Sequence, residues 1–163
     1  MVERLISSVQ NQQIKELKKF FTRKGRKKAG QYLLEGPHLV EMAVKADAEI
    51  QMIYYVPESS HQNVMQIQTL KADLPLTQVT PEVAKALSQT DHHQDIFAVA
   101  NIPQAKSLDI DQLTKGLLIL DQVQDPGNLG TLIRTADAFG YRDVLLGLGT
   151  VDLYNDKVLR SMQ

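Results

Sequence analysis

The chain has 163 residues and a net charge of −1, with 43% apolar and 23% charged residues, which suits one ordinary globular domain or two small ones. No apolar run approaches the ~20 residues needed to span a bilayer, and the opening MVERLISSVQ lacks the apolar core of a signal peptide. The absence of cysteine excludes disulfides and thiolate metal sites, so we expect a cytoplasmic protein without membrane contact.

The first thirty residues are strongly basic. They hold nine of the eighteen Lys and Arg residues against only Glu3 and Glu16, a charge of +7, whereas the remainder carries −8. Apolar residues at helical spacing predict a helix over 8–21, and the lack of periodicity over 22–30 predicts a mobile basic loop. A basic end on an acidic protein is typical of nucleic acid binding; a solvated lysine-rich helix with a loose loop is the alternative.

Strands and helices alternate between residues 31 and 100. We expect strands at 31–34, 50–56, 76–79 and 95–100, and helices at 36–46, 58–72 and 80–88. Thr80 is the expected N-cap of the third helix. The alternation predicts a compact α/β/α sandwich as domain 1–100, followed by a linker over 101–112.

A second α/β unit is expected over residues 113–163. Its predicted elements are strands at 116–120 and 143–146, a helix at 128–139 and a last helix starting near Tyr154 or Asn155. One strand–helix–strand unit cannot cover both faces of a parallel sheet. Its strands should therefore expose apolar side chains, unless a partner chain or further sequence of a longer protein covers them.

The segment around Pro126-Gly127-Asn128 is the strongest candidate site. It follows the carboxyl end of a buried strand, where open α/β sheets place their ligands. Asn128 is the expected N-cap, and Arg134 should reach back over Gly130 to a ligand at the helix start. The expected buried stripe is Leu129, Leu132, Ile133, Ala136 and Phe139 or Gly140.

Each of these features has a structural alternative. Arg134 could pair with Asp137 at the surface, Asn128 could be only a cap, and the glycines could serve close packing. The segment matches neither G-x-G-x-x-G nor a phosphate-binding P-loop.

Three segments resemble one family over nearly the whole chain. They are LDQVQDPGNLGTLIRTADAFG, the following GTVDLYNDKVLRSMQ, and the earlier LISSVQNQQIKELKKFFTRKGRKKAGQYLLEGPHLVEMA. These segments resemble the SpoU family of RNA 2′-O-ribose methyltransferases, members of the knotted SPOUT superfamily. The resemblance implies a ribosomal-protein-like RNA-binding domain followed by the first half of a SPOUT parallel-sheet catalytic domain.

The resemblance also implies an activity and the residues that carry it. The complete protein would transfer a methyl group from S-adenosylmethionine to rRNA or tRNA, as a homodimer. Arg134 matches the arginine thought to activate the ribose hydroxyl or hold its phosphate, and Asn128 matches an asparagine beside the reacting centre. Lys157 and Arg160 match basic positions near the RNA path. Glu35, in the LEG signature, is expected to have a structural or RNA-positioning role.

The basic end then has a predicted partner. Its phosphate-binding candidates are Lys15, Lys18, Lys19, Arg23, Lys24, Arg26, Lys27 and Lys28. The family's donor-binding motifs would lie beyond Gln163, so we expect this polypeptide alone to be inactive. None of the four histidines has a ligand pattern, and no metal is expected. The rival hypothesis is a non-catalytic RNA-binding module.

Overall fold

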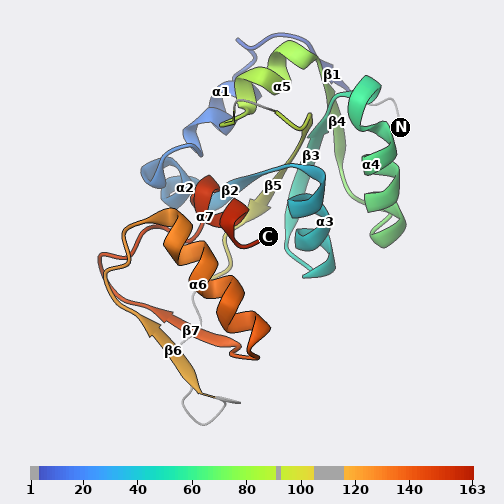
Figure 1. Ribbon diagram of the computed structural model, residues 1–163. Helices are drawn as coiled ribbons and strands as arrows, with labels where there is room; N and C mark the ends of the chain where they lie inside the picture. The colour runs from blue at the N-terminus through green and yellow to red at the C-terminus, as the bar shows by residue number, and fades with distance from the viewer. Residues whose placement is uncertain (1–3, 91–92, 105–115) are drawn as a thin grey trace. The chain divides into compact units, whose positions relative to one another are not determined.

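The computed structural model describes residues 4–90, 93–104 and 116–163. The chain divides into two compact units, Met1–Ile102 and Pro103–Gln163 (Figure 1). Most of the predicted linker, residues 105–112, lies outside the described residues.

A five-stranded mixed sheet forms the centre of the first unit. Its strands are β1 (Leu5–Ile6), β2 (Gln31–Glu35), β3 (Ile50–Tyr55), β4 (Leu76–Val79) and β5 (Ile96–Asn101). They are ordered β1-β4-β3-β5-β2, with β4 parallel to β1 and β3, and β5 antiparallel to β3 and β2. The short edge strand β1 was not predicted, because two residues carry no readable alternation.

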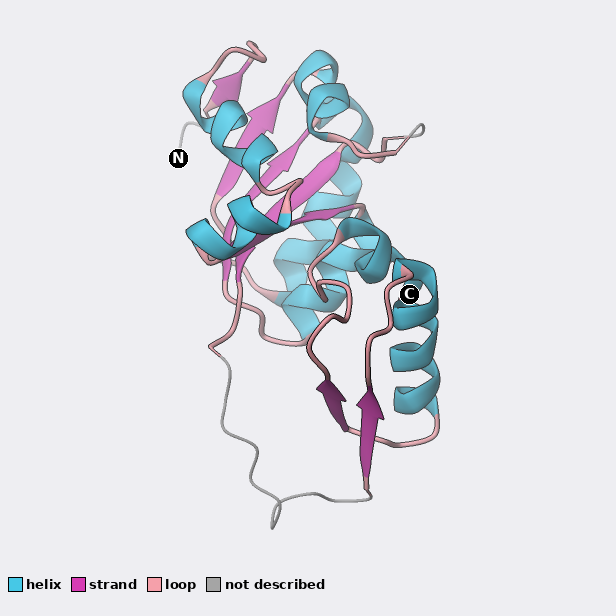
Figure 2. Ribbon diagram, turned by 90° about the vertical axis from the view of Figure 1, so that its left-hand side faces the viewer, coloured by secondary structure: helices cyan, strands magenta, loops and turns pink. Residues whose placement is uncertain are grey.

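Helices cover both faces of this sheet (Figure 2). They are α1 (Gln12–Lys19), α2 (Arg23–Ala29), α3 (Pro37–Lys45), α4 (Pro57–Leu70) and α5 (Pro81–Leu87). Ile14 and Leu17 of α1 join Val83 and Leu87 of α5 in one buried cluster with the sheet, while α3 and α4 pack together on the other face. The predicted α/β/α sandwich is confirmed, and Thr80 caps α5 by accepting from Val83 N at 3.5 Å.

The predicted basic loop over 22–30 is wrong, because these residues form α2. Thr22 Oγ1 accepts from Gly25 N at 3.1 Å at the start of the helix. Gly30 ends it in the left-handed conformation, with φ of 67°, and donates to Arg26 O at 2.8 Å. Caps at both ends stabilise this short helix, and they leave no trace in apolar periodicity.

The second unit is a small strand–helix–strand element with one further helix. It contains β6 (Leu117–Leu120), α6 (Pro126–Ala138), β7 (Asp143–Leu146) and α7 (Asp156–Ser161), with β6 and β7 parallel. Leu120, Leu129 and Val158 form its buried core. Ile119 and Leu145 remain 59% and 38% exposed, as expected for a sheet with an uncovered face.

Helix α6 differs from its prediction at both its start and its buried face. It begins at Pro126, and Asp125 rather than Asn128 is the N-cap. Leu132 was expected to be buried but is 39% exposed, and Phe139, one of two alternatives with Gly140 for the end of the buried stripe, is 76% exposed. The buried residues are Leu129, Gly130 and Ala136, since α6 packs against α7 as well as the strands.

Candidate functional site

The loop between β6 and α6 places Asn128 at the surface. Asp125 Oδ1 accepts from Asn128 N at 2.7 Å, so the backbone of Asn128 completes the cap. Its side chain is exposed and makes no hydrogen bond to any described residue. The amide is thus available to a ligand at the carboxyl end of β6.

Arg134 lies on the exposed surface of α6. Its Nη1 donates to the backbone carbonyl of Gln163 at 2.6 Å. Among the described residues no Asp or Glu side chain pairs with Arg134, so the alternative ion pair with Asp137 does not form. The guanidinium is thus not neutralised by an Asp or Glu side chain of the described structure and can attract an anion.

A hollow of about 370 Å³ opens beside Arg134. Its lining consists of Ile133, Arg134, Asp137, Tyr141, Arg142, Val144 and Met162. Arg142 was missed in the sequence, because it lies in the connection after α6 and outside any periodic element. A second arginine at the same hollow strengthens the preference of this site for negative charge.

Gly130 contacts α7 instead of leaving room for Arg134. A β-carbon at residue 130 would lie 2.4 Å from Ser161 Cβ and 2.7 Å from Val158 O. The expected path of Arg134 over Gly130 is therefore wrong, since α7 fills that space. Of the alternatives for this glycine, close packing is the correct one, although against a helix rather than a strand.

Two further predicted residues lie on α7. Lys157 is exposed, and its backbone N–H is capped by Asn155 Oδ1 at 2.9 Å. Arg160 is half-buried and pairs through Nη2 with Asp156 Oδ2 at 2.8 Å. Arg160 Nη1 is buried without a hydrogen-bond partner in the described structure. Lys157 is thus free for phosphate contact, whereas Arg160 is already paired.

In the first unit, the predicted basic side chains lie on α1 and α2. We define the basic surface as the seven that are exposed or partly exposed, namely Lys15, Lys18, Lys19, Arg23, Lys24, Lys27 and Lys28. Lys19 Nζ contacts Glu16 at 2.6 Å, and this hydrogen bond holds the pKa of Glu16 below its usual value, with a smaller contribution from the charge of Lys28. Such exposed pairs contribute little to stability.

Arg26 does not belong to the basic surface. Its side chain is only 3% exposed, and Nη1 donates to Phe20 O at 2.6 Å. The guanidinium therefore ties α2 to the end of α1, which corrects its place among the phosphate-binding candidates.

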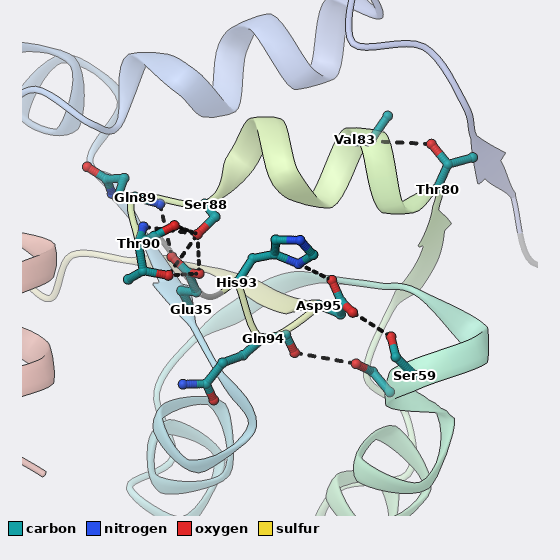
Figure 3. Close-up of polar contacts among 11 residues, drawn as sticks. Glu35, Ser59, Thr80, Val83, Ser88, Gln89, Thr90, His93, Gln94 and Asp95 are labelled. Atoms are coloured by element: carbon teal, nitrogen blue, oxygen red, sulfur yellow. Dashed lines mark hydrogen bonds and ion pairs between the residues drawn. The ribbon is translucent and has the colours of Figure 1, made fainter.

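Glu35 is fully occupied by contacts within the fold (Figure 3). Its carboxylate accepts from Ser88 Oγ at 2.5 Å, Thr90 Oγ1 at 3.1 Å and Gln89 N at 3.2 Å. Gly36 follows with φ of 103°, and a β-carbon there would lie 2.8 Å from Gln94 Oε1. The Glu35-Gly36 pair therefore contacts residues 88–90, which follow α5, and Gln94, which precedes β5.

The same region contains a serine, a histidine and an aspartate that do not form a nucleophile–base pair. His93 Nδ1 contacts Asp95 Oδ1 at 2.5 Å, and Ser59 Oγ donates to Asp95 Oδ2 at 2.7 Å (Figure 3). Both side chains bind the carboxylate, whereas nucleophile activation requires the serine to bind the histidine.

The described part of the chain has neither a metal-binding cluster nor a membrane-spanning helix. Its His, Asp and Glu residues form no group of three or more that could hold a metal ion. None of its helices combines the length and apolar character required to cross a membrane.

Comparison with known proteins gives matches to both units. Residues 11–98 match the MRM3-like substrate binding domain, and residues 115–163 match the SpoU rRNA Methylase family. Over 158 residues the chain is 39% identical to 23S rRNA (guanosine(2553)-2′-O)-methyltransferase RlmP of Bacillus subtilis, covering 97% of this chain and 60% of that protein. The chain thus spans about three fifths of the length of this curated relative.

Solved structures agree with this likeness. A crystal structure of an RNA 2′-O ribose methyltransferase matches with a TM-score of 0.79 and 33% identity, covering 97% of this chain and 60% of that one. An AdoMet-bound rRNA methyltransferase from Sinorhizobium meliloti matches with a TM-score of 0.83 and 26% identity, covering 98% and 60%. Each unit therefore has a fold that occurs in known RNA methyltransferases.

Proposed function

The chain belongs to the SpoU family of rRNA methylases, and from this premise we propose that the whole protein methylates a ribose 2′-hydroxyl of RNA, with rRNA as the first candidate substrate. The observation that carries the proposal is the state of Arg134. It is exposed, has no Asp or Glu partner in the described structure, and shares with Arg142 a hollow whose lining holds two arginines and one carboxylate, that of Asp137.

Arg134 supplies positive charge at the reacting centre. A ribose hydroxyl is a poor nucleophile and becomes more anionic as its oxygen attacks. A guanidinium stays protonated, so Arg134 acts by stabilising that oxygen or by fixing the adjacent phosphate, and not as a base. The free amide of Asn128 orients the ribose at the loop after β6.

S-adenosylmethionine is the proposed methyl donor, and it supplies an electrophilic methyl group when bound. The hollow beside Arg134 does not fit it, because two guanidinium groups against the single carboxylate of Asp137 leave a net positive charge that disfavours the sulfonium. We assign donor binding to the part of the whole protein that this chain does not include, since the chain covers 60% of the length of its relative.

RNA binding is assigned to the basic surface of α1 and α2, with exposed Lys157 as a further phosphate contact and Arg160, held by its pair with Asp156, beside the same path. Lysine contacts to phosphate position RNA without reading its sequence. The uncovered face of β6 and β7, with Ile119 and Leu145, supports assembly of the whole protein as a homodimer. The absence of cysteine is consistent with a cytoplasmic location.

The test is transfer of a labelled methyl group from S-adenosylmethionine to rRNA by the full-length protein. Alkaline hydrolysis of the product distinguishes the site of methylation, because a 2′-O-methylated nucleotide resists cleavage. We expect labelled, alkali-resistant dinucleotides. RNA binding without any transfer would instead favour the non-catalytic RNA-binding module.

A further inference from the structure

The hollow beside Arg134 contains groups that take no part in the chemistry proposed for Arg134. One is the ring of Tyr141, and another is the guanidinium of Arg142. Asp137 provides the single carboxylate of the lining, which is otherwise apolar, with Ile133, Val144 and Met162. The hollow therefore combines an aromatic ring, two cations and one acceptor in one place.

The end of α6 holds Tyr141 in place. Gly140 adopts the left-handed conformation, with φ of 80°. Its N–H donates to Asp137 O at 2.9 Å, and Tyr141 N donates to Ala136 O at 2.9 Å. This pair of hydrogen bonds is the usual closure of a helix by a glycine that follows its last turn. The backbone at Tyr141 is therefore fixed relative to α6, and hence to Arg134.

The ring of Tyr141 is accessible to a ligand. Tyr141 is 43% exposed, and its Cε1 lies 3.5 Å from the position that a β-carbon would take at Gly116. The ring is thus supported by backbone at one side, while much of its surface remains free. Phe139 is exposed nearby but does not line the hollow. Tyr141 is consequently the aromatic side chain of this hollow on which an unpaired base can stack.

Arg142 supplies a cation for a phosphate. Its side chain is exposed and forms no ion pair with an Asp or Glu of the described structure. Asp137 adds an acceptor, which would repel a bare anion but can accept from a sugar hydroxyl or from a base N–H. A guanidinium and a carboxylate in one hollow therefore suit a nucleotide better than an isolated phosphate.

The volume of the hollow limits how much of an RNA chain it can hold. It is about 370 Å³, near the lower end of the range of roughly 300–1,000 Å³ that is usual for ligand pockets. A hollow of this size accommodates a single nucleotide rather than a longer segment of RNA.

We propose that the hollow beside Arg134 binds one nucleotide of the RNA substrate, with its base stacked on Tyr141 and its phosphate bound by Arg142. Tyr141 and Arg142 then hold the RNA while a ribose meets Arg134. This inference rests on the proposed function insofar as it requires an RNA substrate.

The test is RNA binding by the full-length protein, measured by fluorescence anisotropy with a labelled single-stranded oligoribonucleotide at several salt concentrations. Tyr141→Ala should raise the Kd about fivefold or more, the lower limit for stacking of one base on an aromatic side chain. It should leave the slope of log K against log salt unchanged, because no charge is removed. Tyr141→Phe keeps the ring and should retain the affinity.

Arg142→Gln removes the phosphate contact. It should raise the Kd and lower the salt slope by about 0.7, the value for one contact to a single strand. Its thermal unfolding midpoint should be unchanged, since the side chain is exposed, so this variant tests the inference even if Tyr141→Ala unfolds.

Two control variants should bind RNA as the unchanged protein does. Phe139→Ala removes a more exposed aromatic ring that does not line the hollow. Lys71→Gln removes one exposed positive charge from the first unit.

Three results would overturn the inference: an unchanged Kd in Tyr141→Ala, an equal loss of affinity in Phe139→Ala, or an unchanged salt slope in Arg142→Gln. Tight binding of AMP that depends on Tyr141, with RNA affinity unchanged in Tyr141→Ala, would also overturn it and assign the hollow to a free nucleotide. None of these would affect methyl transfer to rRNA by the full-length protein. Conversely, a protein that binds RNA through Tyr141 but transfers no methyl group would contradict only the proposed function.

Discussion

Gly130 of α6 and Ser161 of α7 approach so closely that a β-carbon at residue 130 would lie 2.4 Å from Ser161 Cβ. The backbone of α6 at Gly130 therefore packs directly against the side chain of Ser161 on α7. One turn further along α6, Arg134 donates to the carbonyl of Gln163 at 2.6 Å, immediately after α7. Packing at Gly130 therefore fixes the neighbourhood of the proposed active arginine.

Gly130→Ala should destabilise the second unit by about 1–3 kcal/mol, the usual cost of overpacking. In a helix without this contact the same change would stabilise by roughly 1 kcal/mol, so the sign of the effect is diagnostic. Hydrogen exchange of the α6 amides measures the stability of the second unit separately from that of the first. Thr131→Ala, at an exposed neighbouring position, is the control, and slower exchange in Gly130→Ala would refute close packing.

Variants of Asp125 and Asn128 should have different effects, with Asp125→Ala lowering the stability of α6 and Asn128→Ala lowering methyl transfer. Asp125→Ala removes the observed cap of α6 and should cost about 1 kcal/mol of stability. Asn128→Ala keeps the backbone N–H that the cap uses, so urea unfolding should change little while methyl transfer by the full-length protein falls. Equal loss of stability in both variants would return Asn128 to a purely structural role.

The basic surface can be tested with charge-matched variants. Replacing Lys24, Lys27 and Lys28 by Gln should lower RNA affinity and reduce the slope of log K against log salt by up to about 2 units, at roughly 0.7 per phosphate contact. Replacing Lys45, Lys71 and Lys85 by Gln removes the same charge from other elements. Fluorescence anisotropy at several salt concentrations compares the two, and identical slopes would place the RNA path elsewhere.

Ionisation of the buried Tyr54 phenol should lower the free energy of unfolding at high pH. Burial raises the pKa of its phenol in the folded chain above the unfolded value of about 10. The folded state consequently holds the proton more tightly, so this contribution is fully present below pH 10 and is lost as pH rises further. Urea unfolding between pH 8 and 11 should show less decline in Tyr54→Phe than in the exposed Tyr141→Phe, and parallel declines would count against this cause.

Strong periodicity made most of the fold predictable. The central strands β3, β4 and β5 and the helices between them appear within a few residues of their expected positions, because apolar runs and the Thr80 cap report local structure directly. Features that depend on tertiary contacts were harder. Helix α2 has almost no apolar residues, and its stability comes from caps and from buried Arg26, which the sequence presents as one more surface cation.

In the candidate site, too, local features were predictable from the sequence and tertiary contacts were not. The motif around Asn128 and Arg134 is readable, but the partners of its residues are not. Asp125 and Asn128 are both good caps in sequence, and only the path of the loop decides between them. Phe139 and Gly140 were alternatives for the end of the buried stripe, and Phe139 is the exposed C-cap that follows the last helical residue. The hollow beside Arg134 joins Tyr141 and Arg142 with Met162 of a later segment, and this grouping had no sequence signal.

The central claim is that the guanidinium of Arg134 assists methyl transfer to a ribose hydroxyl. Its most direct test is the single-turnover rate of transfer to rRNA by the full-length Arg134→Ala variant, with Lys45→Ala as a control on α3 and RNA affinity measured alongside. The account predicts a fall of about 100-fold or more in rate, the usual effect of removing one charge-stabilising group, with the fold and the α7 packing intact. A rate equal to that of the unchanged protein would contradict it.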